Sequence, residues 1–315
     1  MYRIIDDKVV ALLAVSVLFV AGSLAVVEHI VTAREENQDS KAVSIQNIFG
    51  NVPLEARAAV VYDIKNKEFL FEKNPEIQMP LASLTKIMTA YAAGSALSRD
   101  EVITVNTASI RREGDSGLKA GERFKLGELL KLTLVHSLND GAIAVANAVE
   151  AKNVAGTASR SFVDRMNDEA KTLGLNQTYF VNADGLDYAS TTSGGYGSAH
   201  DMAILATETL KKFPDIFEAT AYSDISISSL EKRRVHGVNT NKSLDEVPGL
   251  IVSKTGYTDL SSGNLVVIFD VGPEHPTAVV VLGSSIDGRF RDVEKLVNRT
   301  LQSWSALSRT PEAVN

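Results

Sequence analysis

Two side chains in the first third of the chain could together activate a hydroxyl group: Ser83 and Lys86. They are three residues apart, so on a helix they would lie on the same face. A neutral lysine amine in that position can accept the serine proton and produce a nucleophile without a histidine. For this role the pKa of the amine must lie far below its unperturbed value, which burial and a second nearby cation would achieve.

Two further groups of residues could complete such a site. In the first, the hydroxyl of Ser137 can pass a proton to a leaving amine, while the amide of Asn139 positions a substrate backbone. In the second, Lys254 supplies a positive field, Thr255 can hydrogen-bond a substrate carboxylate, and Gly256 allows a substrate backbone to approach closely. The second group is expected on a strand that lines the cleft.

Each of these patterns is weak evidence alone, because short patterns recur by chance. Further Ser-x-x-Lys matches occur at 116–119 and 229–232, and a further Ser-x-Asn occurs at 262–264. A serine at a helix start is also a common N-cap with no catalytic role. The Lys-Thr-Gly group occurs once, and the three groups follow one another in matching secondary structure. Jointly they predict the catalytic residues Ser83, Lys86, Ser137, Asn139 and Lys254.

The hydrophobic pattern predicts an α+β fold with strands near both ends and helices between them. Apolar runs bounded by turn residues predict strands at 58–64, 68–71, 249–253, 264–271 and 278–283. Apolar positions three and four apart predict helices at 82–97, 124–134, 140–151, 161–173, 199–212 and 291–305. We expect one antiparallel sheet in which the N-terminal hairpin pairs with the C-terminal strands, with the helical middle on one side. That arrangement would bring Ser83 and Lys254 into one site.

Composition and charge exclude several classes of function. The chain has 315 residues, which is enough for one large domain or two small ones. Its net charge is −7 and it has no basic stripe, so nucleic acid is not expected as a partner. It has no cysteine, which excludes disulfides and thiolate metal sites. The five histidines show no metal-ligand spacing, so the sequence predicts neither a metal nor another cofactor.

The N-terminal region predicts export. Residues 9–27 carry no charge, and as a helix they would be about 28 Å long, close to one bilayer core. They fit either an uncleaved single membrane helix, which we favour, or a signal peptide cleaved near 23–25. The cations before the run favour a cytoplasmic N-terminus, with the catalytic part outside the cell membrane, or secreted after cleavage. The predicted segments are an anchor or signal at 1–31, a linker at 32–51, a catalytic domain at 52–308 and a tail at 309–315.

Longer stretches around these groups resemble the D-alanyl-D-alanine carboxypeptidases, the low-molecular-mass penicillin-binding proteins. The resemblance runs from about residue 53 to about 305 and includes the active-serine segment Pro80-Leu-Ala-Ser-Leu-Thr-Lys-Ile-Met-Thr-Ala90. Its other parts are Gly114-Asp-Ser-Gly-Leu118, Phe162-Val-Asp-Arg-Met-Asn167, Leu173-Gly-Leu175, Thr178-Tyr-Phe180, Asn182-Ala-Asp-Gly-Leu186, His200-Asp-Met-Ala203 and Val247-Pro-Gly-Leu250. It implies the fold shared by β-lactamases and DD-peptidases.

The same resemblance implies a role for each site residue. Ser83 would be the acylated nucleophile, Lys86 its base, and Ser137 with Lys254 the proton-relay and electrostatic partners. The backbone N–H groups of Ser83 and Tyr257 would form the oxyanion hole, and Arg289 would attract the terminal carboxylate of the substrate. The implied substrate is a peptidoglycan stem peptide that ends in two D-alanines, and β-lactams are the implied inhibitors.

Several functions remain open beside the favoured carboxypeptidase. A DD-endopeptidase that cleaves cross-links would use the same residues. A class A β-lactamase would need a glutamate to activate the deacylating water. Thr172 stands where that glutamate would be expected, four residues before Asn176, which disfavours this alternative. A non-catalytic penicillin sensor is the remaining, less favoured alternative.

Overall fold

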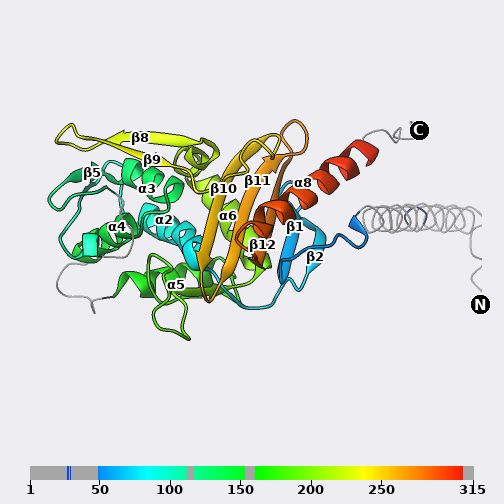
Figure 1. Cartoon of the computed structure of the whole chain (residues 1–315), viewed down its shortest axis with the longest axis horizontal. Coiled ribbons are helices and arrows are strands. Elements are labelled where there is room, and N and C mark those ends of the chain that lie inside the picture. The colour runs from blue at the N-terminus through cyan, green and yellow to red at the C-terminus, as the bar shows by residue number, and fades with distance from the viewer. Residues whose placement is uncertain (1–26, 28, 30–48, 112–116, 153–159, 308–315) are drawn as a thin grey trace, which may run out of the picture. The chain divides into compact units, whose positions relative to one another are not determined.

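The computed structural model describes residues 27, 29, 49–111, 117–152 and 160–307 (Figure 1). The chain divides into two compact units, Met1–Gly50 and Asn51–Asn315, and the fold below is that of the second unit. The predicted anchor, linker and tail lie outside the described residues, apart from 27, 29 and 49–51. Within the described part of the chain, no helix combines the length and apolar content that a membrane span requires.

The second unit is built around a five-stranded antiparallel sheet. This sheet combines strands from the beginning of the unit with strands from near its end. The strand order is β10-β11-β12-β1-β2, so β10 lies at one edge. The strands are β1 (Ala58–Asp63), β2 (Glu68–Lys73), β10 (Leu250–Thr258), β11 (Ser262–Asp270) and β12 (Pro276–Ser284). All of β1 pairs with β12. The predicted pairing of the N-terminal hairpin with the C-terminal strands is therefore confirmed.

Helices cover both faces of this sheet, which explains why its central strands are apolar at consecutive positions. On β12, Val280 faces the main core, which also contains residues of α6 (Ala199–Lys212). Its neighbour Val281 is buried outside that core, on the face that packs against α8 (Gly288–Leu307). Figure 1 shows α8 crossing in front of the sheet. The helical middle therefore lies on one side, as predicted, and the C-terminal helix covers the other.

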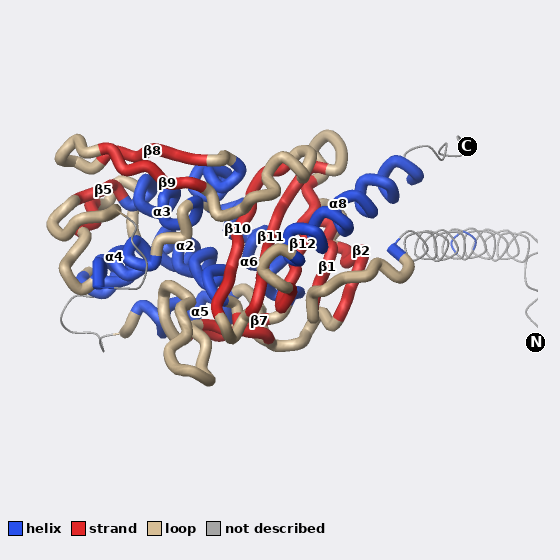
Figure 2. Tube along the Cα trace, viewed as in Figure 1, coloured by secondary structure: helices blue, strands red, loops and turns tan. Residues whose placement is uncertain are grey.

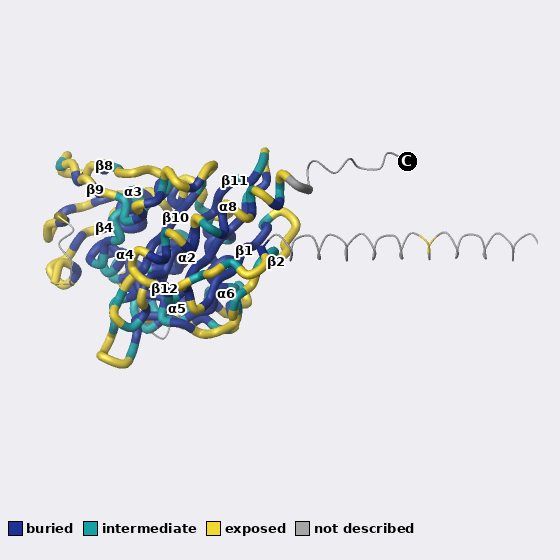
Figure 3. The backbone as a smooth tube through the Cα atoms, turned by 45° about the vertical axis from the view of Figure 1, so that its right-hand side comes forward, coloured by how far each residue is buried: buried dark blue, intermediate teal, exposed yellow. Residues whose placement is uncertain are grey.

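The middle of the chain forms a helical layer next to the sheet (Figure 2). Its helices are α2 (Thr85–Ala96), α3 (Leu126–Val135), α4 (Asn139–Ala151), α5 (Phe162–Thr172), α6 and the short α7 (Pro214–Phe217). The predicted helices are confirmed with small shifts at their ends. α2 is the central helix, because each residue from Thr85 to Ala93 is buried, and Figure 3 shows it enclosed by other elements. A helix buried on all sides can hold a charged side chain away from water.

The sequence reasoning missed the short elements and misjudged one strand. The elements not predicted are β3 (Met79–Pro80), β4 (Val102–Thr104), β5 (Arg123–Lys125), β6 (Tyr179–Phe180), β7 (Gly195–Gly197), β8 (Asp224–Ser228), β9 (Arg234–Val238), α7, η2 (Ser109–Arg111) and η3 (Glu218–Ala221), whereas η1 (Ala82–Leu84) forms the start of the helix predicted at 82–97. The strand predicted at 249–253 ends too early. β10 continues to Thr258 and pairs with β11 through the whole motif, because an edge strand with one paired side tolerates polar residues and glycine.

Candidate active site

The predicted nucleophile, Ser83, lies in a turn that precedes the central helix and is called the nucleophile turn below. The predicted helix at 82–97 begins as the 3₁₀ turn η1, and α2 follows directly. Ala82 has a φ of 50°, a left-handed conformation that costs a non-glycine residue about 1–3 kcal/mol. Neighbouring structure holds the turn, since the Leu81 N–H donates to the Gly195 carbonyl at 2.9 Å. Ser83 follows Ala82 and is only partly buried, so this residue remains partly accessible from outside the core.

Lys86 is fully buried and lies beside the nucleophile. Its Nζ donates to Ser83 Oγ at 2.9 Å, to Asn139 Oδ1 at 2.8 Å and to the Asp184 carbonyl at 2.6 Å. The predicted proximity of Ser83, Lys86 and Asn139 is therefore present in the structure. The amide of Asn139 and the carbonyl of Asp184 fix the amine in place, which leaves its third direction toward the serine hydroxyl.

A second lysine–serine pair faces the same region. Lys254 Nζ donates to Ser137 Oγ at 2.9 Å and to the Thr255 carbonyl at 2.9 Å. Burial lowers the pKa of the Lys254 amine well below its usual value, and the charges of Lys86 and Arg289 lower that pKa further. These shifts favour a neutral amine that can exchange a proton with Ser137. Ser137 itself has a φ of 60°, a second left-handed non-glycine residue at this site.

The edge strand β10 passes very close to the nucleophile turn. A Cβ added to Gly256 would lie 2.7 Å from the Leu81 carbonyl oxygen and 3.3 Å from the Ser83 backbone nitrogen. A side chain at this position would therefore separate β10 from η1. The glycine of the Lys-Thr-Gly group is required by the protein's own packing, in addition to the substrate approach that the sequence suggested.

The edge of β10 that does not pair with β11 presents backbone groups beside the nucleophile turn. The Ser253 N–H donates to Thr220 Oγ1 at 2.9 Å, so it points away from β11. Because strand residues alternate in the direction of their N–H groups, those of Thr255 and Tyr257 face the same open edge. This is the orientation that the predicted oxyanion donor requires. The hydroxyl of Thr255 lies 2.6 Å from that of Thr240, which orients it at the same edge.

Arg289 approaches the site from the first turn of α8. Its Nη1 donates to the Gly256 carbonyl at 2.8 Å, and its buried Nε has no acceptor among the described residues. Burial lowers the pKa of Arg289, but an arginine side chain in a protein stays protonated at neutral pH. The predicted guanidinium is therefore next to the Lys-Thr-Gly strand, with donor capacity left for an anion.

Sequence reasoning missed Asn264, which joins three parts of the site. Its Nδ2 donates to the carbonyls of Pro80 and Leu81 at 3.0 and 3.1 Å, and its Oδ1 accepts from the Gly283 N–H at 2.8 Å. The side chain is fully buried in β11. A signal was available, because an asparagine inside an otherwise apolar strand must satisfy its polar atoms locally. From the sequence alone, residues 262–264 are interpreted as a chance Ser-x-Asn match, and Asn264 as the start of a strand.

The loop at 182–186 supports the nucleophile turn from the other side. The Asp184 carbonyl accepts from Lys86, and the Asn182 side chain accepts from the Gly185 N–H at 2.7 Å. Gly185 has a φ of 79°, and a Cβ there would lie 2.0 Å from the Ala82 carbonyl oxygen. The loop was part of the family resemblance, but no role was assigned to it. Contact with a distant turn leaves no local sequence signal beyond the glycine itself.

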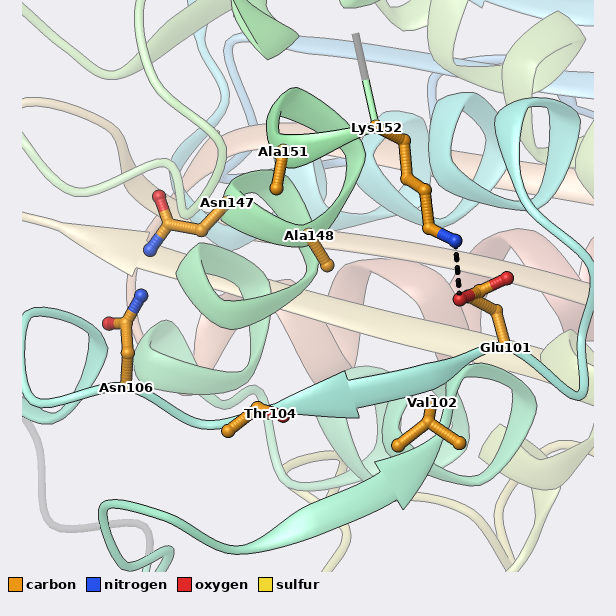
Figure 4. Close-up of a pocket in the computed structure, with 8 residues that line it drawn as sticks. All are labelled: Glu101, Val102, Thr104, Asn106, Asn147, Ala148, Ala151 and Lys152. Carbon is orange, nitrogen blue, oxygen red and sulfur yellow. Dashed lines mark ion pairs between the residues drawn. The ribbon is translucent and has the colours of Figure 1, made fainter. Parts of the chain in front are cut away.

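Two cavities of the described structure differ in how they lie relative to these residues. A cavity of about 290 Å³ between β4 and α4 is lined by Glu101, Val102, Thr104, Asn106, Asn147, Ala148, Ala151 and Lys152 (Figure 4). It contains none of the predicted site residues. A second hollow of about 460 Å³ adjoins Tyr257 and the start of α8.

Thr172, which stands where a class A β-lactamase would have its glutamate, is the last residue of α5. Its hydroxyl donates to the Asp168 carbonyl at 2.9 Å.

The amino-acid sequence of this chain is similar to those of known proteins. Residues 42–285 match the family described as D-alanyl-D-alanine carboxypeptidase, peptidase S11. D-alanyl-D-alanine carboxypeptidase DacF of Bacillus subtilis is 32% identical over 250 residues, which are 78% of this chain and 61% of that protein. A D-alanyl-D-alanine endopeptidase of Haemophilus influenzae is 31% identical over 68% of this chain and 70% of its own length.

The fold is also found in solved structures. Penicillin-binding protein D2 of Listeria monocytogenes, in its ampicillin-bound form, superimposes with a TM-score of 0.65 at 27% identity. The match covers 79% of this chain and 98% of that one. The chain thus spans about three fifths of the DacF relative and nearly all of the Listeria structure. It belongs to the D-alanyl-D-alanine carboxypeptidase family, peptidase S11.

Proposed function

We propose that this protein is a serine-type D-alanyl-D-alanine carboxypeptidase that removes the terminal D-alanine from peptidoglycan stem peptides. The observation that carries the proposal is the distance of 2.9 Å between Lys86 Nζ and Ser83 Oγ, at a fully buried amine. Family membership and the similarity to the named carboxypeptidases support the same reaction class.

In the acylation step, Ser83 attacks the carbonyl between the two D-alanines. The hydroxyl proton moves to Lys86 Nζ as the bond from Oγ to the carbonyl carbon forms. A neutral Lys86 amine keeps two N–H groups for Asn139 Oδ1 and the Asp184 carbonyl, and presents its lone pair to the serine. The negative charge that develops on the carbonyl oxygen is stabilised by the backbone N–H groups of Ser83 and Tyr257.

The second lysine serves the departure of D-alanine. When the carbon–nitrogen bond breaks, the leaving amine takes a proton from the Ser137 hydroxyl. Ser137 recovers, by way of the Lys254 amine, the proton that Lys86 took from Ser83, so both lysine amines are neutral again. The carboxylate of the leaving D-alanine lies against Thr255, in the positive field of Arg289. Water then attacks the ester on Ser83, with Lys86 as the base, and releases the shortened peptide.

β-Lactams are proposed to acylate the same serine. They combine a carboxylate with a strained amide, so they fit the same anion site and oxyanion hole. After the ring opens, the former leaving group stays attached and the ester is long-lived. The ampicillin-bound Listeria structure, which shares this fold, supports the assignment.

A mass-spectrometric assay with two substrates tests the proposal. The protein and its Ser83→Ala variant are incubated with a pentapeptide stem and, separately, with a cross-linked stem dimer. Loss of one D-alanine from the pentapeptide, by the unaltered protein alone, is the expected result. A folded protein that cleaves neither peptide, or a Ser83→Ala variant as active as the parent, would refute the function.

A DD-endopeptidase is the second candidate, because the Haemophilus relative carries that activity in its name. Preferential cleavage of the dimer would replace the carboxypeptidase assignment with this one. Penicillin turnover much faster than peptide cleavage would instead favour a β-lactamase. Thr172 stands where a class A β-lactamase would have its glutamate base, and its hydroxyl donates a hydrogen bond within α5. This residue therefore gives no support to the β-lactamase alternative.

We further propose that residues 9–27 anchor the protein in the cell membrane, with the catalytic domain outside. Nineteen consecutive uncharged residues, mostly Val, Leu and Ala, support a single spanning helix. Fractionation of cells that produce the full chain tests this proposal, together with the mass of the mature N-terminus. Recovery in the membrane fraction at full mass is expected. A shortened soluble form would identify a cleaved signal instead.

A further inference from the structure

Three side chains with metal-binding atoms meet between the start of α6 and the connection from β2 to β3. Glu76, His200 and Asp201 each offer one ligand atom, and these atoms lie within 4.8 Å of one another. His200 Nδ1 is 3.7 Å from Glu76 Oε1 and 3.8 Å from Asp201 Oδ1. We propose that these three residues bind a divalent transition-metal cation of the Zn²⁺ class, at a site separate from the catalytic residues.

The separations fit a single ion after small movements. Two atoms that each lie about 2.1 Å from one tetrahedral ion are about 3.4 Å apart. The two distances from His200 Nδ1 exceed this value by a few tenths of an ångström. Glu76 is 55% exposed at its side chain and lies in the connection between β2 and β3, so rotation of its carboxylate can close the gap.

One of the three ligands is held in advance by the protein. The Asp201 side chain is 3% exposed, and its Oδ2 accepts from the Gln177 N–H and from Thr178 Oγ1, both at 2.8 Å. No described residue donates a hydrogen bond to the other oxygen, Oδ1, which is the oxygen near His200. A buried carboxylate with one oxygen fixed and the other directed at an imidazole resembles the oriented ligand of a metal site.

The histidine is also oriented. Its ring stacks on Phe69 with centroids 4.3 Å apart, and its backbone N–H donates to the Pro75 carbonyl at 3.1 Å. These contacts tie the first turn of α6 to the loop that carries Glu76. The His200 side chain is 34% exposed, so an ion can reach Nδ1 and water can complete its coordination.

The donor set selects among cations. An imidazole nitrogen with two carboxylate oxygens suits Zn²⁺ or Co²⁺, whereas Mg²⁺ and Ca²⁺ prefer oxygen ligands alone. Sequence spacing could not reveal this set, because Glu76 is far from the adjacent pair His200-Asp201 along the chain. The sequence prediction of no metal rested on spacing alone.

The position of the site gives the ion a structural consequence. The loop with Glu76 leads into β3, where Met79 pairs with Gly197 at the start of the segment that enters α6. An ion bound by both Glu76 and Asp201 would cross-link the two segments of the chain that flank the nucleophile turn. Binding to the folded state alone would raise the melting temperature as the ion concentration rises.

Calorimetric titration of the chelator-treated full-length protein with ZnCl₂ tests the proposal. One Zn²⁺ per chain is expected, with no competition from Mg²⁺, and Co²⁺ should give the visible absorption of a tetrahedral nitrogen–oxygen site. Glu76→Gln and His200→Ala should each weaken Zn²⁺ binding by more than about tenfold. Hydrogen exchange in residues 74–78 should slow on Zn²⁺ addition in the parent protein alone.

His236→Ala is the matched control. His236 Nδ1 lies 3.8 Å from Asp224 Oδ1, so this exposed pair has the same spacing with a single carboxylate. Its loss should leave Zn²⁺ affinity unchanged. The proposal is overturned by the absence of saturable Zn²⁺ binding, or by binding that neither Glu76→Gln nor His200→Ala weakens. Variants that change thermal stability in zinc-free buffer without any Zn²⁺ binding would identify an ion-paired histidine, which also overturns it.

Discussion

The amine of Lys254 lies 2.9 Å from the hydroxyl of Ser137, although 117 positions separate these residues in the sequence. The pair repeats the relation of Lys86 to Ser83, where amine and hydroxyl are also 2.9 Å apart. Two separate amine–hydroxyl pairs allow the two proton transfers of acyl transfer to be divided between them. In the mechanism that we propose, Lys86 acts on the nucleophile, and Lys254 acts on the leaving group through Ser137.

This division predicts unequal effects of removing one group from each pair. Lys86→Ala should abolish labelling by a fluorescent penicillin, because it removes the amine that lies 2.9 Å from Ser83 Oγ and is the proposed acceptor of the serine proton. Ser137→Ala should slow labelling by about 10²–10⁴-fold, the usual contribution of one proton-transfer group, and leave a measurable rate. Time-resolved labelling on gels measures both rates.

Lys232→Ala is the control for these variants. Lys232 belongs to the chance Ser-x-x-Lys match at 229–232 and is exposed. Its labelling rate should stay within about twofold of the parent, since a surface charge far from the reacting atoms contributes little. If Ser137→Ala were the more damaging change, Lys86 would not be the base.

The lowered pKa of Lys254 predicts how stability changes with pH. The folded chain releases this proton at a lower pH than the unfolded chain, whose lysine has its usual pKa near 10.5. Between those two values the unfolded state binds more protons, so the free energy of unfolding rises with pH and falls as pH decreases toward the folded pKa. Burying this amine therefore costs stability at neutral pH.

Lys254→Met should accordingly be more stable than the parent at pH 7, although inactive. An increase in melting temperature of about 2–4 °C corresponds to about 1 kcal/mol for a domain of this size. The difference should shrink as the pH approaches 10.5, the usual lysine value. Calorimetric scans from pH 7 to about pH 10 measure it, with exposed Lys242→Met as the control. A variant less stable than the parent at every pH would contradict the prediction.

Asn264 should affect both stability and reactivity. Asn264→Ala leaves the carbonyls of Pro80 and Leu81 and the Gly283 N–H without this partner, at a cost of about 2–4 kcal/mol in the free energy of unfolding. Because Leu81 immediately precedes the nucleophile turn, the acylation rate should also fall by about tenfold or more.

Urea unfolding and labelling well below the melting temperature separate the two effects. Asn176→Ala, at an exposed asparagine, is the control and should change neither quantity by more than about 0.5 kcal/mol or twofold. A destabilised Asn264→Ala variant with an unchanged acylation rate would restrict Asn264 to a purely structural role.

Two glycines with similar φ angles should differ in how much stability is lost when each is replaced by alanine. Gly174 has a φ of 71° and nothing within 4 Å of an added Cβ, so Gly174→Ala carries only the conformational cost of about 1–2 kcal/mol. At Gly185, with a φ of 79°, the added Cβ would also meet the Ala82 carbonyl oxygen at 2.0 Å. Gly185→Ala should therefore cost clearly more and slow acylation, while Gly174→Ala leaves acylation unchanged. Equal costs in urea unfolding would show that the turn moves freely.

The sequence predicted those parts of the site that are encoded locally. Ser83 and Lys86 share one turn, and their chemistry could be inferred from their residue types and spacing. The long apolar strands and amphipathic helices were also predictable, because burial of one or both faces leaves a periodic pattern. The pairing of the first and last strands followed from their order along the chain.

Other parts depend on contacts that no local pattern encodes. The left-handed conformations at Ala82 and Ser137 are imposed by tertiary packing on residues that avoid that region. Asn264 reads as an isolated polar residue until its partners around Leu81 are known. Two-residue strands such as Met79–Pro80 are too short for any periodicity to appear.

The closure of the sheet by strands from both ends of the domain has a consequence for biosynthesis. β1 leaves the ribosome early, but its partner β12 is completed only at residue 284. Pairing over such a separation is slow and occurs late in folding. An interrupted chain that ends before residue 250 would carry the reactive serine without the strand that faces it. Under the proposed function, incomplete products should therefore hydrolyse no peptide, and activity should appear only after the domain is complete.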